Sequence, residues 1–80
     1  MNKQTRARIL ILDDEQLVRN SLADYLQDAG FETVCFASGE EAIETLGSER
    51  FDVAVVDMRM PGMNGNQFID RSLTDSPLFP

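Results

Sequence analysis

The stretch Ile9–Glu15, which reads Ile-Leu-Ile-Leu-Asp-Asp-Glu, decides the fold together with the stretch Val53–Asp57, which reads Val-Ala-Val-Val-Asp. In each stretch a run of four apolar residues stops at an acidic residue. Continuous apolar runs of this length are typical of strands that are buried on both faces, as in a parallel sheet. Because ligands of open parallel sheets collect at the carboxyl ends of the strands, we expect a binding site where these two runs end.

Strand-like and helix-like segments alternate along the whole chain. Residues 8–13, 31–37 and 51–56 predict strands, and residues 15–29, 39–46 and 66–73 predict helices. This alternation implies right-handed crossovers and an α/β fold with a parallel sheet. The flavodoxin-like arrangement places the first strand between the second and third, in the order 2-1-3. That order brings the acidic ends of the first and third strands to the same edge.

The predicted helices carry apolar stripes and end signals. The stripe of the first helix comprises Leu17, Val18, Leu22, Tyr25, Leu26 and Ala29. Gly30 stands where a helix is expected to stop. Ser38 and Glu41 form a capping-box pattern at the start of the second helix. The apolar residues of the last two helices are Ala42, Ile43 and Leu46, and Phe68, Ile69 and Leu73.

Three carboxylates, those of Asp13, Asp14 and Asp57, are expected to meet at the carboxyl edge of the sheet. Their charges repel one another unless a cation lies among them. A hard ion with oxygen ligands satisfies this arrangement, and Mg²⁺ is the first candidate. The alternative is that the aspartates only cap helices, with Asp14 as the N-cap of the first helix. Glu15 is expected to be a solvent-facing acid of the first turn, favoured by the helix dipole, rather than a ligand of the cation.

Composition limits the class of protein and its partners. Eighty residues make one small domain with marginal stability. The net charge of −7 argues against a direct nucleic-acid partner, because phosphate binding needs clustered Lys and Arg. We interpret the basic group Lys3, Arg6 and Arg8 as a solvated, frayed end, with an electrostatic arm as the alternative. No stretch predicts a membrane span or a signal peptide, so the expected location is the cytoplasm. Cys35 is expected in the core of its strand.

Two separate motifs resemble the receiver domain of two-component response regulators. The Asp13-Asp14 pair follows the first strand, and Asp57 is followed by the segment Met60–Gly65, which reads Met-Pro-Gly-Met-Asn-Gly. The resemblance runs from about Arg8 to the helix after Gly65. It implies that residues 1–80 are the N-terminal portion of a single receiver domain, a partial flavodoxin-like fold that lacks the last two strand–helix units.

The resemblance implies a role for each site residue. Asp57 is the expected phosphoacceptor, a carboxylate nucleophile that takes a phosphoryl group from a sensor histidine kinase. Asp14 and Asp57 are expected to bind Mg²⁺ directly, with the main-chain oxygen of Arg59, and Asp13 acts largely through bound water. The side chain of Arg59 either reaches over the phosphoryl group or is a surface charge. A receiver is a phosphoacceptor signalling domain, and no enzyme activity is expected.

The chain differs from the family in the residues that respond to phosphorylation of the aspartate. The family uses a Ser or Thr after a fourth strand and a Lys after a fifth. Here the single Lys is Lys3. Ser72, Thr74 and Ser76 come too soon after Asp57 and lie in or after a helix, not after a strand. The normal switch is therefore not expected. The apolar third strand also becomes a sheet edge, which predicts self-association through that strand. A fold-back of residues 77–80 over the exposed surface is the weaker option.

Two other functions compete with the receiver reading. A pseudo-receiver would act as a protein-interaction or dimerisation module without being phosphorylated. The intact acidic trio opposes it, because clustered charge is costly without a function. A Mg²⁺-dependent phosphatase would use a second Asp two residues after the nucleophile, where this chain has Arg59. Three methionines, Met58, Met60 and Met63, lie close together in the sequence. We expect them to pack at the entrance of the site, and a soft-metal site is the less favoured interpretation.

Overall fold

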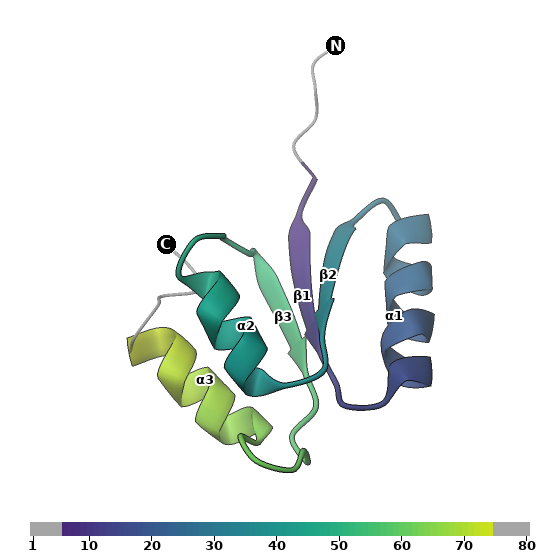
Figure 1. Ribbon diagram of the computed structural model, residues 1–80. Helices are drawn as coiled ribbons and strands as arrows, with labels where there is room; N and C mark the ends of the chain where they lie inside the picture. Colours follow the sequence, from purple (N-terminus) through teal and green to yellow (C-terminus); the bar gives the residue numbers. More distant parts are fainter. Residues whose placement is uncertain (1–5, 75–80) are drawn as a thin grey trace.

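The computed structural model describes residues 6–74, apart from the side chains of Leu73 and Thr74. Six elements follow one another in strand–helix alternation (Figure 1). They are β1 (Arg8–Leu12), α1 (Gln16–Asp28), β2 (Glu32–Phe36), α2 (Gly39–Leu46), β3 (Val53–Val56) and α3 (Gly65–Thr74). Every predicted element is present, and each bound lies within two residues of its prediction.

The three strands form one parallel sheet in the order β2-β1-β3, which confirms the predicted order. In this register Leu10 of β1 lies between Val34 of β2 and Ala54 of β3. All three strands point the same way, so the loops after β1 and β3 lie at one edge of the sheet, the lower edge in Figure 1. This common edge is where the site is built.

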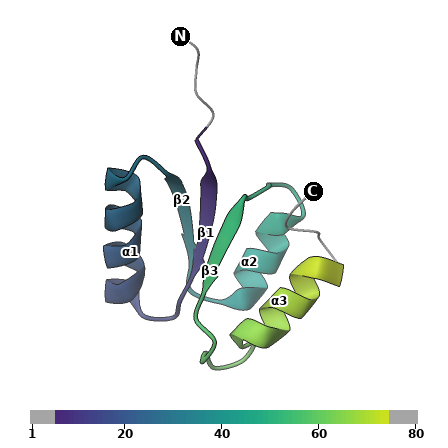
Figure 2. The ribbon, with the colours of Figure 1, turned by 180° about the vertical axis from the view of Figure 1, so that it is seen from behind.

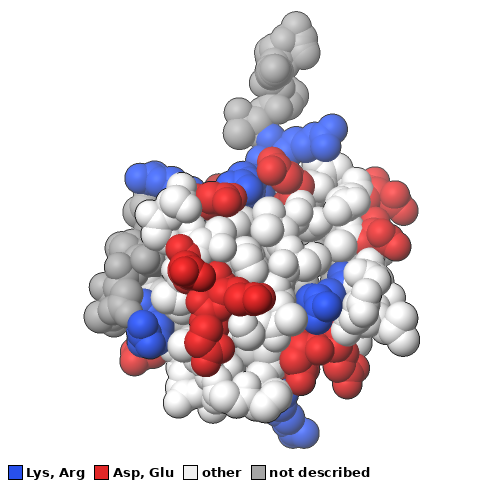
Figure 3. All heavy atoms as spheres, in the orientation of Figure 1, with Lys and Arg blue, Asp and Glu red and all other residues white. Residues whose placement is uncertain are grey.

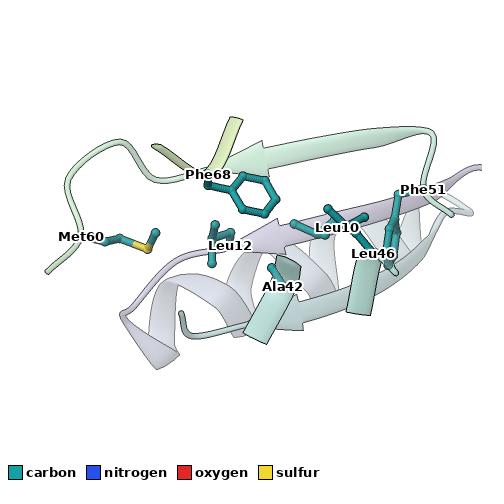
Figure 4. Close-up of a cluster of buried hydrophobic side chains, with 7 residues drawn as sticks. All are labelled: Leu10, Leu12, Ala42, Leu46, Phe51, Met60 and Phe68. Carbon is teal, nitrogen blue, oxygen red and sulfur yellow. The ribbon is translucent and has the colours of Figure 1, made fainter. Parts of the chain in front are cut away.

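Helices cover both faces of the sheet. Helix α1 lies on one side, and α2 and α3 lie together on the other (Figures 1 and 2). The main core fills the space between the sheet, α2 and α3 (Figure 4). Its buried members are Leu10, Leu12, Ala42, Leu46, Phe51, Met60 and Phe68. Burial of these apolar side chains is the main force that holds α2 and α3 on the sheet.

The predicted helix boundaries have their expected hydrogen bonds. Ser38 is the N-cap of α2, and its hydroxyl accepts from the Glu41 N–H at 3.3 Å. At the end of α1 the N–H of Gly30 donates to Gln27 O at 3.0 Å. The N–H of Phe31 donates to Leu26 O, also at 3.0 Å. Gly30 has φ of 101°, so a residue without a side chain is favoured at this Schellman turn.

The apolar stripe predicted for α1 is only partly correct. Leu22 and Leu26 are half-buried, whereas Leu17 and Tyr25 are 81% and 72% exposed. Helix α1 is the only described helix on its face of the sheet, so no second helix packs beside it there. In α3 Gly65, Phe68 and Ser72 are buried, and Ile69 is 41% exposed, contrary to its predicted inward position. A helix buries the residues that face a neighbouring layer, and the sequence does not show where that layer lies.

Cys35 is exposed, so its predicted core position is wrong. The adjacent side chains of Val34 and Phe36 pack against the main core, and strand alternation directs Cys35 to the opposite face. That face carries only α1 among the described elements, and β2 is an edge strand. Partial desolvation raises the pKa of the Cys35 thiol, and the positive charge of Arg19 partly offsets this.

Arg8 is not part of a frayed end, which corrects the prediction for the basic N-terminal group. Its guanidinium pairs with Glu32 at 3.1 Å and with Glu49 at 2.9 Å, and it donates to the main-chain oxygen of Arg50 at 3.0 Å. It also lies 4.8 Å from the centroid of the Phe51 ring. The hydrogen bond with Glu49 is the main cause that raises the pKa of Arg8. Arg6 is exposed, and Lys3 lies outside the described residues.

Strand β3 is an edge of the sheet, as the sequence predicted: among residues 6–74 it pairs with β1 alone. Val53 and Val55 are 45% and 37% exposed, whereas Ala54 and Val56 pack against the main core. The face beneath α1 is therefore incompletely covered along β3. Across the described residues, no helix has the length and apolar character needed to cross a membrane.

We predict that Arg8→Met lowers the free energy of unfolding by about 1 kcal/mol, because partly exposed charge-assisted hydrogen bonds contribute on this scale. Urea denaturation followed by circular dichroism measures the change. The matched control is Arg6→Met, which removes the same charge from an exposed neighbour. Equal stability of the two variants would contradict a stabilising role for the Arg8 contacts.

Candidate functional site

Three carboxylates meet at the carboxyl edge of the sheet. Asp13, Asp14 and Asp57 each offer one carboxylate oxygen, and these oxygens lie within 4.8 Å of one another. Asp13 and Asp57 are half-buried, and Asp14 is exposed. Asp13 and Asp14 follow β1, whereas Asp57 follows β3, so the pairing of these two strands brings the groups together. The structure thus assembles the acidic cluster that the sequence predicted.

Asp13 is held by both its main chain and its side chain. Its N–H donates to Phe36 O at 3.2 Å, which ties the end of β1 to the end of β2. Its main-chain oxygen accepts from Arg19 Nη1 at 2.8 Å. Its carboxylate Oδ1 accepts from the Glu15 N–H at 2.9 Å. These contacts define the path of the loop that presents both Asp13 and Asp14.

Asp57 is held in a similar way from the side of β3. Its N–H donates to Leu12 O at 2.8 Å and so extends the pairing of β1 and β3 by one residue. Its carboxylate Oδ1 accepts from the Arg59 N–H at 2.9 Å. The start of α3 also packs tightly here: a Cβ on Gly65 would lie 2.9 Å from Asp57 O and 2.8 Å from Met58 Cα. Only glycine allows this approach.

Helix capping does not account for the position of Asp14. The N-cap of α1 is Glu15, whose side chain makes no capping hydrogen bond. The sequence predicted Glu15 in the first turn of the helix, whereas in the structure it is the N-cap, one position earlier. It is exposed, as expected for an acid at a helix N-terminus.

The oxygen atoms that the cluster offers as metal ligands suit a small, hard divalent cation. All three groups of the cluster are carboxylates, and oxygen ligands of this kind are preferred by Mg²⁺. Each carboxylate has about four lone-pair positions, so one accepted N–H on Asp13 and one on Asp57 leave sites for a cation. The half-buried position of two members strengthens their attraction for a cation relative to fully hydrated carboxylates. The residues present therefore fit the ion.

The methionines of the following loop act mainly in packing. Met60 is buried in the main core, and Met63 packs against that core and lies beside Gly39. Met58 is 46% exposed, with its sulfur close to Gly65. The packing interpretation is therefore confirmed for Met60 and Met63. The loop bends at Gly62, whose φ of 74° lies in the left-handed region.

Arg19 is the site-associated residue that the sequence analysis missed. It is half-buried on α1, next to the half-buried Leu22 and Ala23. Its position one and two helical turns from Leu22 and Leu26 marks it as a basic residue on the sheet-facing stripe. A charged residue on a stripe that faces a sheet was the signal that could have identified it.

Comparison with known proteins defines the family. The family model of the response regulator receiver domain matches residues 9–78. The chain is 34% identical over 68 residues to the transcriptional regulatory protein CrdR of Helicobacter pylori. It is 35% identical over 74 residues to the response regulator protein FleR of Pseudomonas aeruginosa. The chain therefore belongs to the receiver domain family of response regulators, which receive signals in two-component systems.

Solved structures agree with this assignment. The chemotaxis response regulator CheY4 of Vibrio cholerae superposes with a TM-score of 0.85 at 38% identity, over 90% of this chain. The N-terminal domain of FixJ superposes with a TM-score of 0.86 at 31% identity, over 96% of this chain. The regulator TrrA of Thermotoga maritima, solved in complex with Mg²⁺ and BeF, has a TM-score of 0.78 at 35% identity, over 82% of this chain. The three-stranded arrangement is thus a partial CheY-like, flavodoxin-like fold.

The chain spans only part of these relatives. It covers 32% of CrdR and 16% of FleR, and 60% of CheY4, 62% of the FixJ domain and 57% of TrrA. Receiver domains as a family bind Mg²⁺ and interact with sensor histidine kinases. Two-component signal reception is accordingly the function of this family, and the pseudo-receiver alternative is not favoured.

We predict that Gly65→Ala destabilises the loop that carries Asp57, because the added Cβ would collide with main-chain atoms of Asp57 and Met58. Overpacking of this kind costs about 1–3 kcal/mol of unfolding free energy. Urea denaturation measures the loss, and Asn66→Ala at the adjacent exposed position is the control. If Gly65→Ala were as stable as that control, the close approach would not constrain the loop.

Proposed function

We propose that this chain accepts a phosphoryl group from a sensor histidine kinase onto Asp57, with Mg²⁺ bound at the acidic cluster. The observation that carries the proposal is the convergence of the Asp13, Asp14 and Asp57 carboxylate oxygens within 4.8 Å. Family membership supports the same chemistry. The relative TrrA, crystallised with Mg²⁺ and BeF, supports the choice of ion.

Each residue has a distinct role in this proposal. Asp14 and Asp57 bind the ion directly, together with the main-chain oxygen of Arg59, and Asp13 acts through bound water. Bound Mg²⁺ supplies positive charge that offsets the charge of the incoming phosphoryl group. The Arg59 N–H holds Asp57 Oδ1 at 2.9 Å and thereby orients the carboxylate.

Asp57 is the nucleophile of the transfer. One of its carboxylate oxygens forms a bond to phosphorus, while the bond from phosphorus to the imidazole nitrogen of the kinase's phosphohistidine breaks. The electron pair of that bond stays on the nitrogen, so an imidazole ring that is protonated on its other nitrogen leaves in neutral form, and the product is an aspartyl phosphate. No proton needs to leave Asp57, because its carboxylate is used in the ionised form.

The remaining parts of the proposal concern context. We place residues 1–80 in the N-terminal portion of one receiver domain, in the cytoplasm, with a protein kinase rather than nucleic acid as partner. The net charge of −7 supports this choice, because it repels phosphate backbones. Acidic side chains gather over α2, whose first turn carries Glu40 and Glu41 (Figure 3). The side chain of Arg59 is exposed, two positions after Asp57, and either reaches over the phosphoryl group or is a surface charge.

We predict that incubation with acetyl phosphate and Mg²⁺ adds the mass of one phosphoryl group to this chain. Intact-mass spectrometry detects the adduct. Asp57→Asn is expected to abolish it, because an amide is a poor nucleophile, and a chelator of divalent cations should do the same. The matched control is Asp52→Asn, an exposed aspartate at the opposite end of β3. Absence of the adduct in folded protein would contradict the proposal.

We also propose that the chain self-associates through the edge of β3, with a second copy as the occupant. The free edge and the exposed side chains of Val53 and Val55 support this. An apolar edge strand offers unpaired main-chain groups that another strand can bind. The alternative fold-back involves residues 77–80, which lie outside the described residues.

We predict that the sedimentation coefficient rises with protein concentration, and that Val55→Lys suppresses this rise. A lysine at an edge strand opposes pairing with another edge. Ile69→Lys is the control, because Ile69 is a similarly exposed apolar residue on α3, across the sheet from α1. A concentration-independent monomer, or equal loss of association in both variants, would contradict the β3 interface.

A further inference from the structure

Arg19 connects helix α1 to the loop that carries two of the three site carboxylates. Its Nη1 atom donates a hydrogen bond to the main-chain oxygen of Asp13 at 2.8 Å, in a partly buried setting. The main-chain N–H of Arg19 donates to Glu15 O at 3.0 Å, so the backbone and the side chain of one residue contact both ends of the same loop.

The accepting oxygen belongs to the peptide group that joins Asp13 to Asp14. Holding that peptide in place limits the directions in which the two side chains leave the chain. The other ties to Asp13 are the bond from its N–H to Phe36 O and the Asp13–Glu15 contact, which is local to the loop. The bond from Arg19 anchors this peptide to α1.

The guanidinium of Arg19 also acts on β2. Desolvation raises the pKa of the Cys35 thiol, and the positive charge of Arg19 lowers it by a smaller amount. Arg19 belongs to α1, and its side chain contacts the residue that follows β1. A charged side chain in such a half-buried place carries a desolvation cost, and an apolar residue would fill the same space without that cost. The bond to Asp13 is what an apolar residue would not supply.

We propose that Arg19 is a positioning residue for the acidic cluster: through the Asp13 carbonyl it sets the carboxylates of Asp13 and Asp14 to converge with Asp57 on the cation. This inference rests on the proposed function. It gives helix α1, which contains Arg19, a role in the site in addition to the three aspartates.

A direct electrostatic effect of Arg19 would have the opposite sign. A positive charge close to the cluster repels a divalent cation, so its removal by itself would strengthen Mg²⁺ binding. Positioning predicts weaker binding when the charge and the donor are both removed. The direction of the change therefore separates the two effects.

The test is isothermal titration calorimetry of the full chain with Mg²⁺. We expect Arg19→Met to raise the Kd about tenfold, on the scale of losses of outer contacts at metal sites. Arg19→Lys keeps a positive charge and a hydrogen-bond donor. Its Kd should stay within about threefold of that of the parent protein, a difference in binding free energy smaller than that of a typical hydrogen bond. Arg6→Met is the control for loss of charge, since Arg6 precedes β1 at the other end of the sheet. An unchanged or lower Kd in folded Arg19→Met would overturn the inference.

A second measurement does not require the ion. Backbone ¹⁵N relaxation of the Mg²⁺-free protein reports the order parameters of Asp14 and Glu15. We expect Arg19→Met to lower them from about 0.85 toward 0.6, with Arg19→Lys remaining near the parent value. If the parent protein did not bind Mg²⁺, the proposed function would fail, and these order parameters would still decide whether Arg19 positions the loop. Unchanged order parameters in Arg19→Met would reject that role.

Discussion

The parallel pairing of β1 with both of its neighbours is the constraint on which the rest of the structure depends. Strand β1 lies in the middle of the sheet, and residues 9–12 are buried. Its pairing with β3 continues to the bond between the Asp57 N–H and Leu12 O, so the residues that follow the two strands are neighbours in space. A shift of this register by one residue would turn the apolar side chains of β3 to the opposite face and move Asp57 away from Asp13.

Hydrogen-bond donors around the acidic cluster, both neutral N–H groups and a positively charged guanidinium, hold it in place. Main-chain N–H groups hold one oxygen of Asp13 and one of Asp57, and Arg19 holds the peptide behind Asp13. These bonds orient the carboxylates before any ligand arrives, and a preorganised site loses less free energy on binding. The fold thus keeps three like charges together at one edge of the sheet, with Asp14 exposed and Asp13 and Asp57 half-buried.

The two faces of the sheet are unequally covered, and this explains most of the exposed apolar surface. Helices α2 and α3 enclose a continuous core on one face, whereas α1 stands alone on the other among the described elements. Leu17, Tyr25, Val53 and Val55 are exposed as a result. Apolar surface of this kind favours contact with another chain, and the same face carries the free edge of β3.

The sequence by itself determined the order of the elements and the three aspartates, because these follow from short-range patterns: apolar runs, caps and the residues that end each strand. The order of the strands followed from the flavodoxin-like arrangement that such an alternation favours. Only the tertiary structure decided which layer each side chain meets. Arg8 contacts residues more than twenty positions away, Arg19 reaches back to the loop before its helix, and Cys35 faces an incompletely covered side of the sheet. Burial and long-range hydrogen bonds depend on how the layers stack, and local periodicity does not carry that information.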